Sequence, residues 1–152
     1  MEPLAMWLTR FSRLNSVALE GHAAGYGSTS SESAVLGALL LGGPVLNPSD
    51  LTKLVVQSPG GLTKTLRRLE DAGHIRRRPD PADRRALLVV LTEKGRRAAE
   101  RADVELHSYY DELLADLSAS ERSELSLLLR KVLDRLEIAT GMTRSAWPPV
   151  GT

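Results

Sequence analysis

Apolar residues recur at three- and four-residue steps near both ends of the chain, a spacing that predicts amphipathic helices. The first is expected over residues 3–24, with a stripe made of Leu4, Trp7, Leu8, Phe11, Leu14 and Ala18. Two long helices are expected over 92–117 and 119–139, the first capped by Thr92 and the second by a capping box of Ser118 and Glu121. Leucines on the last helix spread beyond one face, so this helix needs apolar partners on several sides, and a second subunit is expected to provide them.

The middle of the chain predicts shorter helices with clear start signals. A Ser/Thr cluster at residues 28–30 can cap a buried helix that runs to about Leu41. Asn47-Pro48 and Ser58-Pro59 then each place a capping side chain before a proline at the first helical position. Helices are therefore expected over 48–55 and 59–72 with a short turn between them, which is a helix-turn-helix.

The second helix of this pair has one apolar side and one basic side. At 100° per residue, Leu62, Leu66 and Leu69 share a stripe, and Lys64 and Arg67 lie opposite it. Gly73 is suited to the left-handed conformation that ends a helix. One side is expected to pack in the core and the other to face a partner.

Residues 75–91 change to the pattern of a β-hairpin. Two extended runs flank the Pro/Asp-rich connection 79–83, and the tip carries Arg84 and Arg85. The expected fold class is therefore mainly α with a small β-hairpin wing: a winged helix-turn-helix flanked by N- and C-terminal helices.

The net charge of +1 conceals an uneven distribution along the chain. Residues 62–101 hold twelve of the 20 Lys and Arg but only six of the 19 Asp and Glu. Such concentration favours a surface made for a polyanion, although a solvated helix face rich in Arg gives the same charge pattern. Geometry has to decide between the two.

The composition and the motifs exclude several classes of protein and of chemical site. The chain has no cysteine, which excludes disulfides and Cys-ligated zinc, and no apolar run approaches the roughly 20 residues of a bilayer span. The N-terminus lacks the pattern of a signal peptide, so a cytoplasmic protein without membrane contact is expected. No nucleophile elbow, phosphate-binding glycine loop or His-rich motif occurs, so neither an enzyme nor a cofactor or metal site is expected.

A helix-turn-helix reads DNA by placing its second helix in the major groove, and an Arg-tipped wing can reach the adjacent minor groove. Gly60 and Gly61 weaken a helix, a cost that makes sense where the backbone approaches DNA closely; the alternative is a flexible loop over 58–61. Asp83 is expected to accept hydrogen bonds that hold the tip in shape. The candidate DNA-binding residues are Ser58, Gly60, Gly61, Thr63, Lys64, Arg67, Arg68, Arg78, Asp83, Arg84 and Arg85.

The run from Leu66 to Arg85, followed by Val89-Val90-Leu91-Thr92-Glu93-Lys94-Gly95, resembles the MarR-type winged-helix regulators. In this resemblance, Asp83 and Arg85 match the family's Asp-x-Arg wing motif. His74 stands where an apolar residue is common, and the absence of cysteine excludes the peroxide-sensing branch.

The resemblance implies a homodimer with interlocked terminal helices. Such a two-fold dimer is expected to bind an inverted repeat in double-stranded DNA, because both recognition helices must meet the same face of the groove. The resemblance further implies a ligand-responsive repressor that releases DNA when a small aromatic or anionic effector binds between the dimer helices and the DNA-binding lobe. A single domain over 1–152 is expected, with the lobe at about 30–91, dimerisation helices at 3–24 and 92–140, and a flexible tail at 141–152. A winged helix used only to bind proteins is the alternative, although it predicts acidic or apolar residues where Lys64, Arg67 and Arg85 stand.

Two weaker patterns complete the candidates. An effector cavity could be lined by Trp7, Phe11, His22 and Tyr26, with Arg10 or Arg13 meeting an anion, although such a stripe is also ordinary core. Asp103, His107 and Asp111 share one helix face and could touch a metal, although a solvated or interface face is the simpler interpretation.

Overall fold

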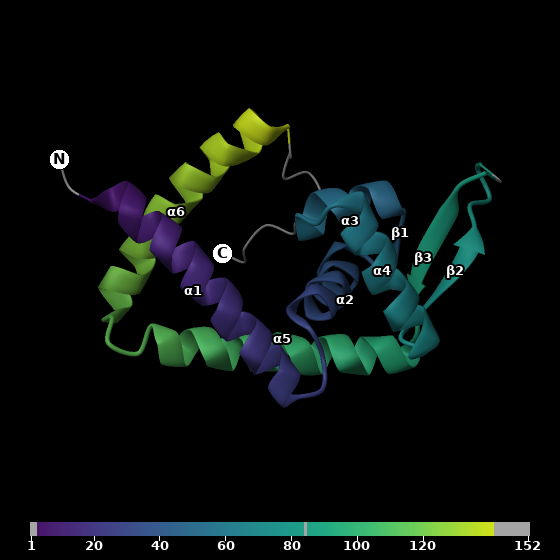
Figure 1. Cartoon of the computed structure of the whole chain (residues 1–152), viewed down its shortest axis with the longest axis horizontal. Coiled ribbons are helices and arrows are strands. Elements are labelled where there is room, and N and C mark those ends of the chain that lie inside the picture. The colour runs from purple at the N-terminus through teal and green to yellow at the C-terminus, as the bar shows by residue number, and fades with distance from the viewer. Residues whose placement is uncertain (1–2, 84, 142–152) are drawn as a thin grey trace.

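The computed structural model describes residues 3–83 and 85–141, and within them the chain forms six helices and a three-stranded sheet (Figure 1). The helices are α1 (Leu4–Gly25), α2 (Ser30–Gly42), α3 (Pro48–Val55), α4 (Pro59–Asp71), α5 (Glu93–Leu113) and α6 (Ala119–Thr140). The strands are β1 (Val45–Leu46), β2 (Ile75–Pro79) and β3 (Leu87–Leu91). The predicted fold class, mainly helical with a hairpin wing, is confirmed. Arg84 and residues 142–152 of the predicted tail lie outside the described residues.

Polar side chains begin helices α2 to α6 as predicted, whereas α1 follows Pro3 without a side-chain cap. The Thr29 and Ser118 hydroxyls accept from the amides of Glu32 and Glu121, whose carboxylates accept from the capping residues in return. Asn47, Ser58 and Thr92 cap α3, α4 and α5. Because each cap satisfies an amide that the helix leaves free, the starts are fixed locally by sequence.

The turn between α3 and α4 passes through a left-handed residue, Val56, at φ 50°. A β-branched residue in this region is strained, and Val56 has no compensating burial because 73% of it is exposed. At the other end of α4, Gly73 adopts φ 73° and the amide of His74 bonds the carbonyl of Leu69 at 2.8 Å. Both positions match the predicted turn and helix end.

The sheet differs from the prediction in having a third strand. Its order is β1-β3-β2, all antiparallel, with Val45 opposite Val90 and Arg77 opposite Val89. β1 is only two residues long, too short to produce the alternation by which a strand is recognised in sequence. By pairing with β3, β1 connects the segment before α3 to the base of the wing hairpin.

The buried core lies between α2, α3, α4 and the sheet. Its members include Val35, Leu39, Leu51, Leu62, Leu66, Leu69, Ile75, Val89 and Ala99, so the predicted leucine stripe of α4 is buried. α5 approaches so closely that a Cβ on Gly95 would lie 1.8 Å from the carbonyl oxygen of His74. The lobe is thereby fixed on the first turns of α5.

α5 ends four residues earlier than predicted. Leu114 caps it, and residues 114–117 form a turn before Ser118 starts α6. No glycine or proline marks this end, so the pattern alone could not locate it.

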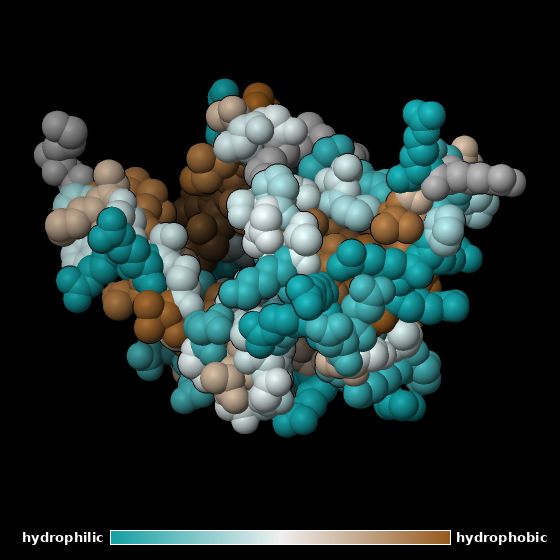
Figure 2. Space-filling view, turned by 45° about the vertical axis from the view of Figure 1, so that its right-hand side comes forward, coloured by the Kyte–Doolittle hydropathy of each residue, from teal (hydrophilic) through white to brown (hydrophobic). Residues whose placement is uncertain are grey.

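α1 crosses α5 beside α2 and runs outward from the lobe, and α6 rises from the far end of α5 and slants back toward the lobe, so that the two helices form arms beside it (Figure 1). The α6 residues Leu128, Val132 and Leu136 are about half exposed, as are Trp7 and Phe11 of α1. Figure 2 shows brown, apolar residues in the recess between the N-terminal arm and the lobe. These faces lack a cover within the described chain. Among the described helices, none has the combination of length and apolar content needed to cross a membrane.

Candidate nucleic-acid interface

The basic side of α4 is held outward by the burial of its opposite side. Leu62, Leu66 and Leu69 are each less than 5% exposed, whereas Lys64 and Arg67 face away from the core. The side chain of Arg67 is 82% exposed, and among the described residues its one ion-pair contact is with Asp71, also mostly exposed, at 4.0 Å along the same helix. A contact so long and so exposed leaves the guanidinium available to another partner.

The first turn of α4 presents backbone rather than side chains. Gly60 has nothing within 4 Å of the position its Cβ would take, so no packing within the described residues explains the absence of a side chain. Gly61 is different because a Cβ there would lie 3.1 Å from Ser58 Oγ, which caps the helix by accepting from the Gly61 amide at 3.2 Å. Thr63 Oγ1 donates to the Pro59 carbonyl at 2.9 Å. A regular capped turn therefore replaces the alternative of a flexible loop over 58–61.

Arg68 is directed elsewhere. Its Nε lies 3.1 Å from Glu32 Oε1, on the N-terminal turn of α2, and the Glu32 side chain is only 13% exposed. Among the described candidate DNA contacts on α4, Arg68 is the one that forms an ion pair with another helix, α2. The acid that holds it is 36 positions earlier in the chain, which spacing could not reveal.

The wing tip is built by two aspartates. Asp83 Oδ1 accepts from the amide of Arg85 at 2.9 Å, and Asp80 Oδ1 accepts from that of Ala82 at 2.8 Å. The structural role predicted for Asp83 is confirmed. Arg78 and Arg85 are exposed, and neither has an ion-pair partner among the described residues.

A link between α4 and the wing was missed from the sequence. Glu70 accepts from the Arg77 amide at 3.2 Å, and its carboxylate lies 3.3 Å from Arg77 Nε. This pair fixes the wing relative to the helix beside it. An acid on α4 and a basic residue inside β2 were the available signals, but only the packing of α4 against β2 shows that they face each other.

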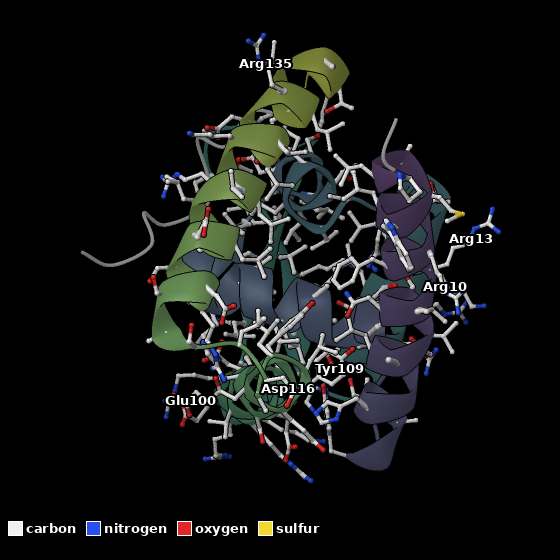
Figure 3. The ribbon with its side chains drawn as sticks, turned by 90° about the vertical axis from the view of Figure 1, so that its left-hand side faces the viewer. Arg10, Arg13, Glu100, Tyr109, Asp116 and Arg135 are labelled. Atoms are coloured by element: carbon white, nitrogen blue, oxygen red, sulfur yellow. The ribbon has the colours of Figure 1, made fainter. Side chains whose placement is uncertain are left out.

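The candidate effector residues on α1 are only partly brought together. His22 contacts Tyr26 at 5.8 Å and Tyr109 at 5.4 Å between ring centroids, and its Nε2 lies 3.0 Å from the Glu105 carbonyl oxygen. Trp7 and Phe11 lie nearer the N-terminus of α1 than His22, and both are more than half exposed. In Figure 3, Arg10 and Arg13 point away from Tyr109 and the space between the helices. In the single chain Arg10 and Arg13 lie on the opposite face of α1 from Tyr109, so the anion contact expected of Arg10 or Arg13 stays a prediction.

Tyr109 and Asn15 complete this cluster and were not anticipated. The Tyr109 hydroxyl donates to Asn15 Oδ1 at 2.9 Å, and Asn15 Nδ2 donates to the Tyr110 hydroxyl at 3.2 Å. Burial raises the pKa of Tyr109, with a contribution from Tyr110, so the phenol remains a donor. The cluster anchors α1 on α5.

Of the three candidate metal ligands on α5, only Asp103 and His107 meet, with His107 Nδ1 3.6 Å from Asp103 Oδ2. His107 Nδ1 lies 2.8 Å from the Asp103 carbonyl oxygen, whereas Asp111 faces Arg122 at 3.4 Å. In the parts of the chain that the structure describes, no group of three or more candidate ligands could hold a metal.

Comparison with known proteins gives a consistent picture. Residues 26–86 match the model of the MarR family. The chain is 34% identical to the HTH-type transcriptional regulator YwoH of Bacillus subtilis over 72% of this chain and 79% of that protein. It is also 34% identical to the transcriptional activatory protein BadR of Rhodopseudomonas palustris, over 73% of this chain but only 65% of BadR.

A solved structure of a MarR variant from E. coli, complexed with operator DNA, is similar over most of its length. It has a TM-score of 0.75 and 29% identity, covering 86% of this chain and 94% of that one. The named relatives are transcriptional regulators rather than enzymes. This chain therefore belongs to the MarR family of transcriptional regulators.

Proposed function

We propose that this protein is a sequence-specific regulator that binds an inverted repeat in double-stranded DNA as a homodimer and acts as a ligand-responsive repressor. The residues at about 30–91 would form the DNA-binding lobe of a single domain. Helices within 3–24 and 92–140 would join two copies.

The observation that carries this proposal is the outward basic face of α4 beside an Arg-bearing wing. Lys64 and Arg67 project from a helix whose first turn, at Gly60, exposes bare backbone. A helix of this kind fits the major groove, with cations on phosphates or on the acceptor edge of guanine. Arg85, held beside Asp83, would enter the adjacent minor groove. The structural relative solved with operator DNA supports this assignment.

The homodimer is proposed from the uncovered apolar arms. Among the described residues α6 makes at most marginal contact with other elements, and it exposes Leu128, Val132 and Leu136. In proteins most of a helix's stability comes from tertiary packing of its apolar face, which α6 lacks within the described chain. A second copy that supplies the same faces would bury both arms around a two-fold axis.

The effector is proposed to bind beside the cluster of His22, Tyr26 and Tyr109, with Trp7 and Phe11 of α1 closing the site once a second subunit is present. Within one chain the His22 ring already contacts the Glu105 carbonyl oxygen, and the Tyr109 hydroxyl already donates to Asn15. A ligand there would lie between α1, α5 and the lobe, where it could bias the lobe against DNA.

Fluorescence anisotropy with duplex DNA from upstream of the protein's own gene, repeated over a series of salt concentrations, tests the DNA-binding assignment. Arg85→Ala should weaken binding and flatten the salt dependence, because each phosphate contact contributes about 0.9 to the slope of log affinity against log salt. Arg10→Ala is the matched control, since Arg10 points away from the molecule (Figure 3).

The proposal predicts tight binding by the parent protein and by Arg10→Ala, with a shallower slope for Arg85→Ala alone. Equal affinity for unrelated DNA would contradict sequence-specific binding. Identical slopes for the parent and Arg85→Ala would contradict the role given to the wing. Absence of DNA binding altogether would favour the protein-interaction module.

A further inference from the structure

The wing is supported on both of its edges at one level of the hairpin. Arg77 of β2 pairs with Val89 of β3, and Val89 in turn pairs with Leu46 of β1. β1 therefore holds the β3 side of the hairpin, whereas β2 is an edge strand of the sheet. On the β2 side the support comes from α4, because the Arg77 amide donates to Glu70 Oε1 at 3.2 Å.

Beyond this level the hairpin extends into solvent. Pro79 and Leu87, the strand residues nearest the tip, are both exposed. Among the described residues, the contact of Glu70 with Arg77 is the one hydrogen-bonded or ion-paired link between an α4 side chain and the strands of the wing. The direction in which the tip and Arg85 extend is therefore fixed at the level of this link.

The side-chain part of the link is sheltered from water. Arg77 Nε is buried and makes no hydrogen bond among the described residues, so its compensation is the Glu70 carboxylate, 3.3 Å away. A buried cationic nitrogen that loses its counter-charge is costly. Without Glu70 the Arg77 side chain would turn outward to water, and the amide of the edge strand would lose its acceptor. Both changes would loosen β2 from α4.

We infer that Glu70 is a positioning residue for DNA binding, which holds the wing against α4 so that Arg85 reaches the minor groove while α4 occupies the major groove. This role rests on the proposed DNA binding and involves no contact between Glu70 and DNA. The expected effect of removing Glu70 is opposite in sign to the effect of its charge alone. An acid near DNA repels phosphates, so its loss should strengthen binding, whereas a displaced wing should weaken it.

Fluorescence anisotropy of the full-length protein with duplex DNA from upstream of its own gene tests this role in Glu70→Ala. Affinity should fall by about tenfold, the loss expected when a charged group no longer reaches its hydrogen-bond partner. Glu70→Gln keeps an acceptor for the Arg77 amide, so its affinity should lie between those of Glu70→Ala and the parent.

Asp71→Ala is the matched control. It removes an acid from the next position of α4, and Asp71 contacts Arg67 rather than the wing. Asp71→Ala should bind DNA at least as tightly as the parent. A Glu70→Ala protein that also binds at least as tightly as the parent would overturn the inference.

A double-mutant cycle with Arg85→Ala shows whether Glu70 acts through the wing. Two residues that serve one contact are not additive, so Glu70→Ala should weaken binding by less than about threefold once Arg85 is absent. An equal loss in the parent and in the Arg85→Ala background would overturn the inference, because Glu70 would then act on DNA binding by another route.

Hydrogen exchange of the free full-length protein, followed by mass spectrometry, measures the hold on the wing without DNA. Amides of β2 and β3 should exchange faster in Glu70→Ala than in the parent or Asp71→Ala, while those of α2 stay unchanged. Unchanged exchange in both strands, or faster exchange that includes α2, would overturn a role confined to the wing. If the parent binds no DNA, the proposed function is refuted, and faster exchange confined to β2 and β3 would still support the hold of Glu70 on the wing.

Discussion

Gly60→Ala separates what the fold needs from what DNA binding needs. Gly60 is the second residue of α4, its φ is not positive, and nothing lies within 4 Å of an added Cβ. Alanine is favoured over glycine by about 0.5–1 kcal/mol inside a helix and by less in a first turn. The free energy of unfolding should therefore rise by up to about 0.5 kcal/mol.

DNA affinity should move in the opposite direction. A methyl group at Gly60 would stand between the helix N-terminus and the phosphate backbone, and a lost hydrogen bond to a charged group costs about 1.5–3 kcal/mol. A fall in affinity of about tenfold or more is expected. Urea unfolding and fluorescence anisotropy on the same preparations give the two quantities.

Gly21→Ala is the matched control. Gly21 is an exposed residue within α1, and an added Cβ there also meets nothing within 4 Å. The substitution should stabilise the protein by about 0.5–1 kcal/mol and leave DNA affinity unchanged. If Gly60→Ala bound DNA with the affinity of the parent, the proposed close approach of the α4 backbone to DNA would be refuted. A clear loss of stability in Gly60→Ala would show that the space around Gly60 is not open.

Three further outcomes are expected. Truncation after Leu117 removes α6 and should yield monomers in sedimentation velocity, so a stable truncated dimer would show that the interface lies elsewhere. Val56→Gly relieves a left-handed residue that is 73% exposed, and it should raise the free energy of unfolding by about 1 kcal/mol in urea titrations, whereas a decrease would show that the valine is not strained. Gly95→Ala forces a Cβ into the His74 carbonyl and should cost about 1–3 kcal/mol or more, a reasoning that unchanged stability would refute.

Local signals account for the part of the fold that the sequence predicted well. A cap and a proline at Ser58-Pro59, a leucine stripe and a terminal Gly73 act within a few residues of one another, so each could be located from spacing. The same holds for the wing tip, where Asp83 bonds the backbone two residues away. These signals define α4 and the wing, the two parts of the proposed DNA surface.

Contacts between distant segments could not be predicted in the same way. β1 exists because Val45 and Leu46 meet β3, more than 40 positions later, and two residues cannot carry a period of their own. The pairing of Arg68 with Glu32 and of Arg77 with Glu70 depends on how α4 sits against α2 and β2.

The sequence also could not predict which way the side chains of α1 point relative to the rest of the protein. A stripe of Trp7 and Phe11 predicts which residues share a face, and a step of 100° per residue places Arg13 on another face. Trp7, Phe11 and Arg13 could line one cavity only if another segment contacted both of these faces of α1. Figure 3 shows Arg13 turned outward from the cluster at Tyr109.

Selection from a random-sequence library of double-stranded DNA by the purified full-length protein tests the central claim most directly. Two copies of α4 related by a two-fold axis should enrich an inverted repeat whose half-sites lie about 10 bp apart, centre to centre. The enriched duplex should bind the parent protein and lose affinity for Gly60→Ala. Absence of any enriched sequence, or enrichment of a motif without two-fold symmetry, would contradict a homodimer that reads DNA with α4.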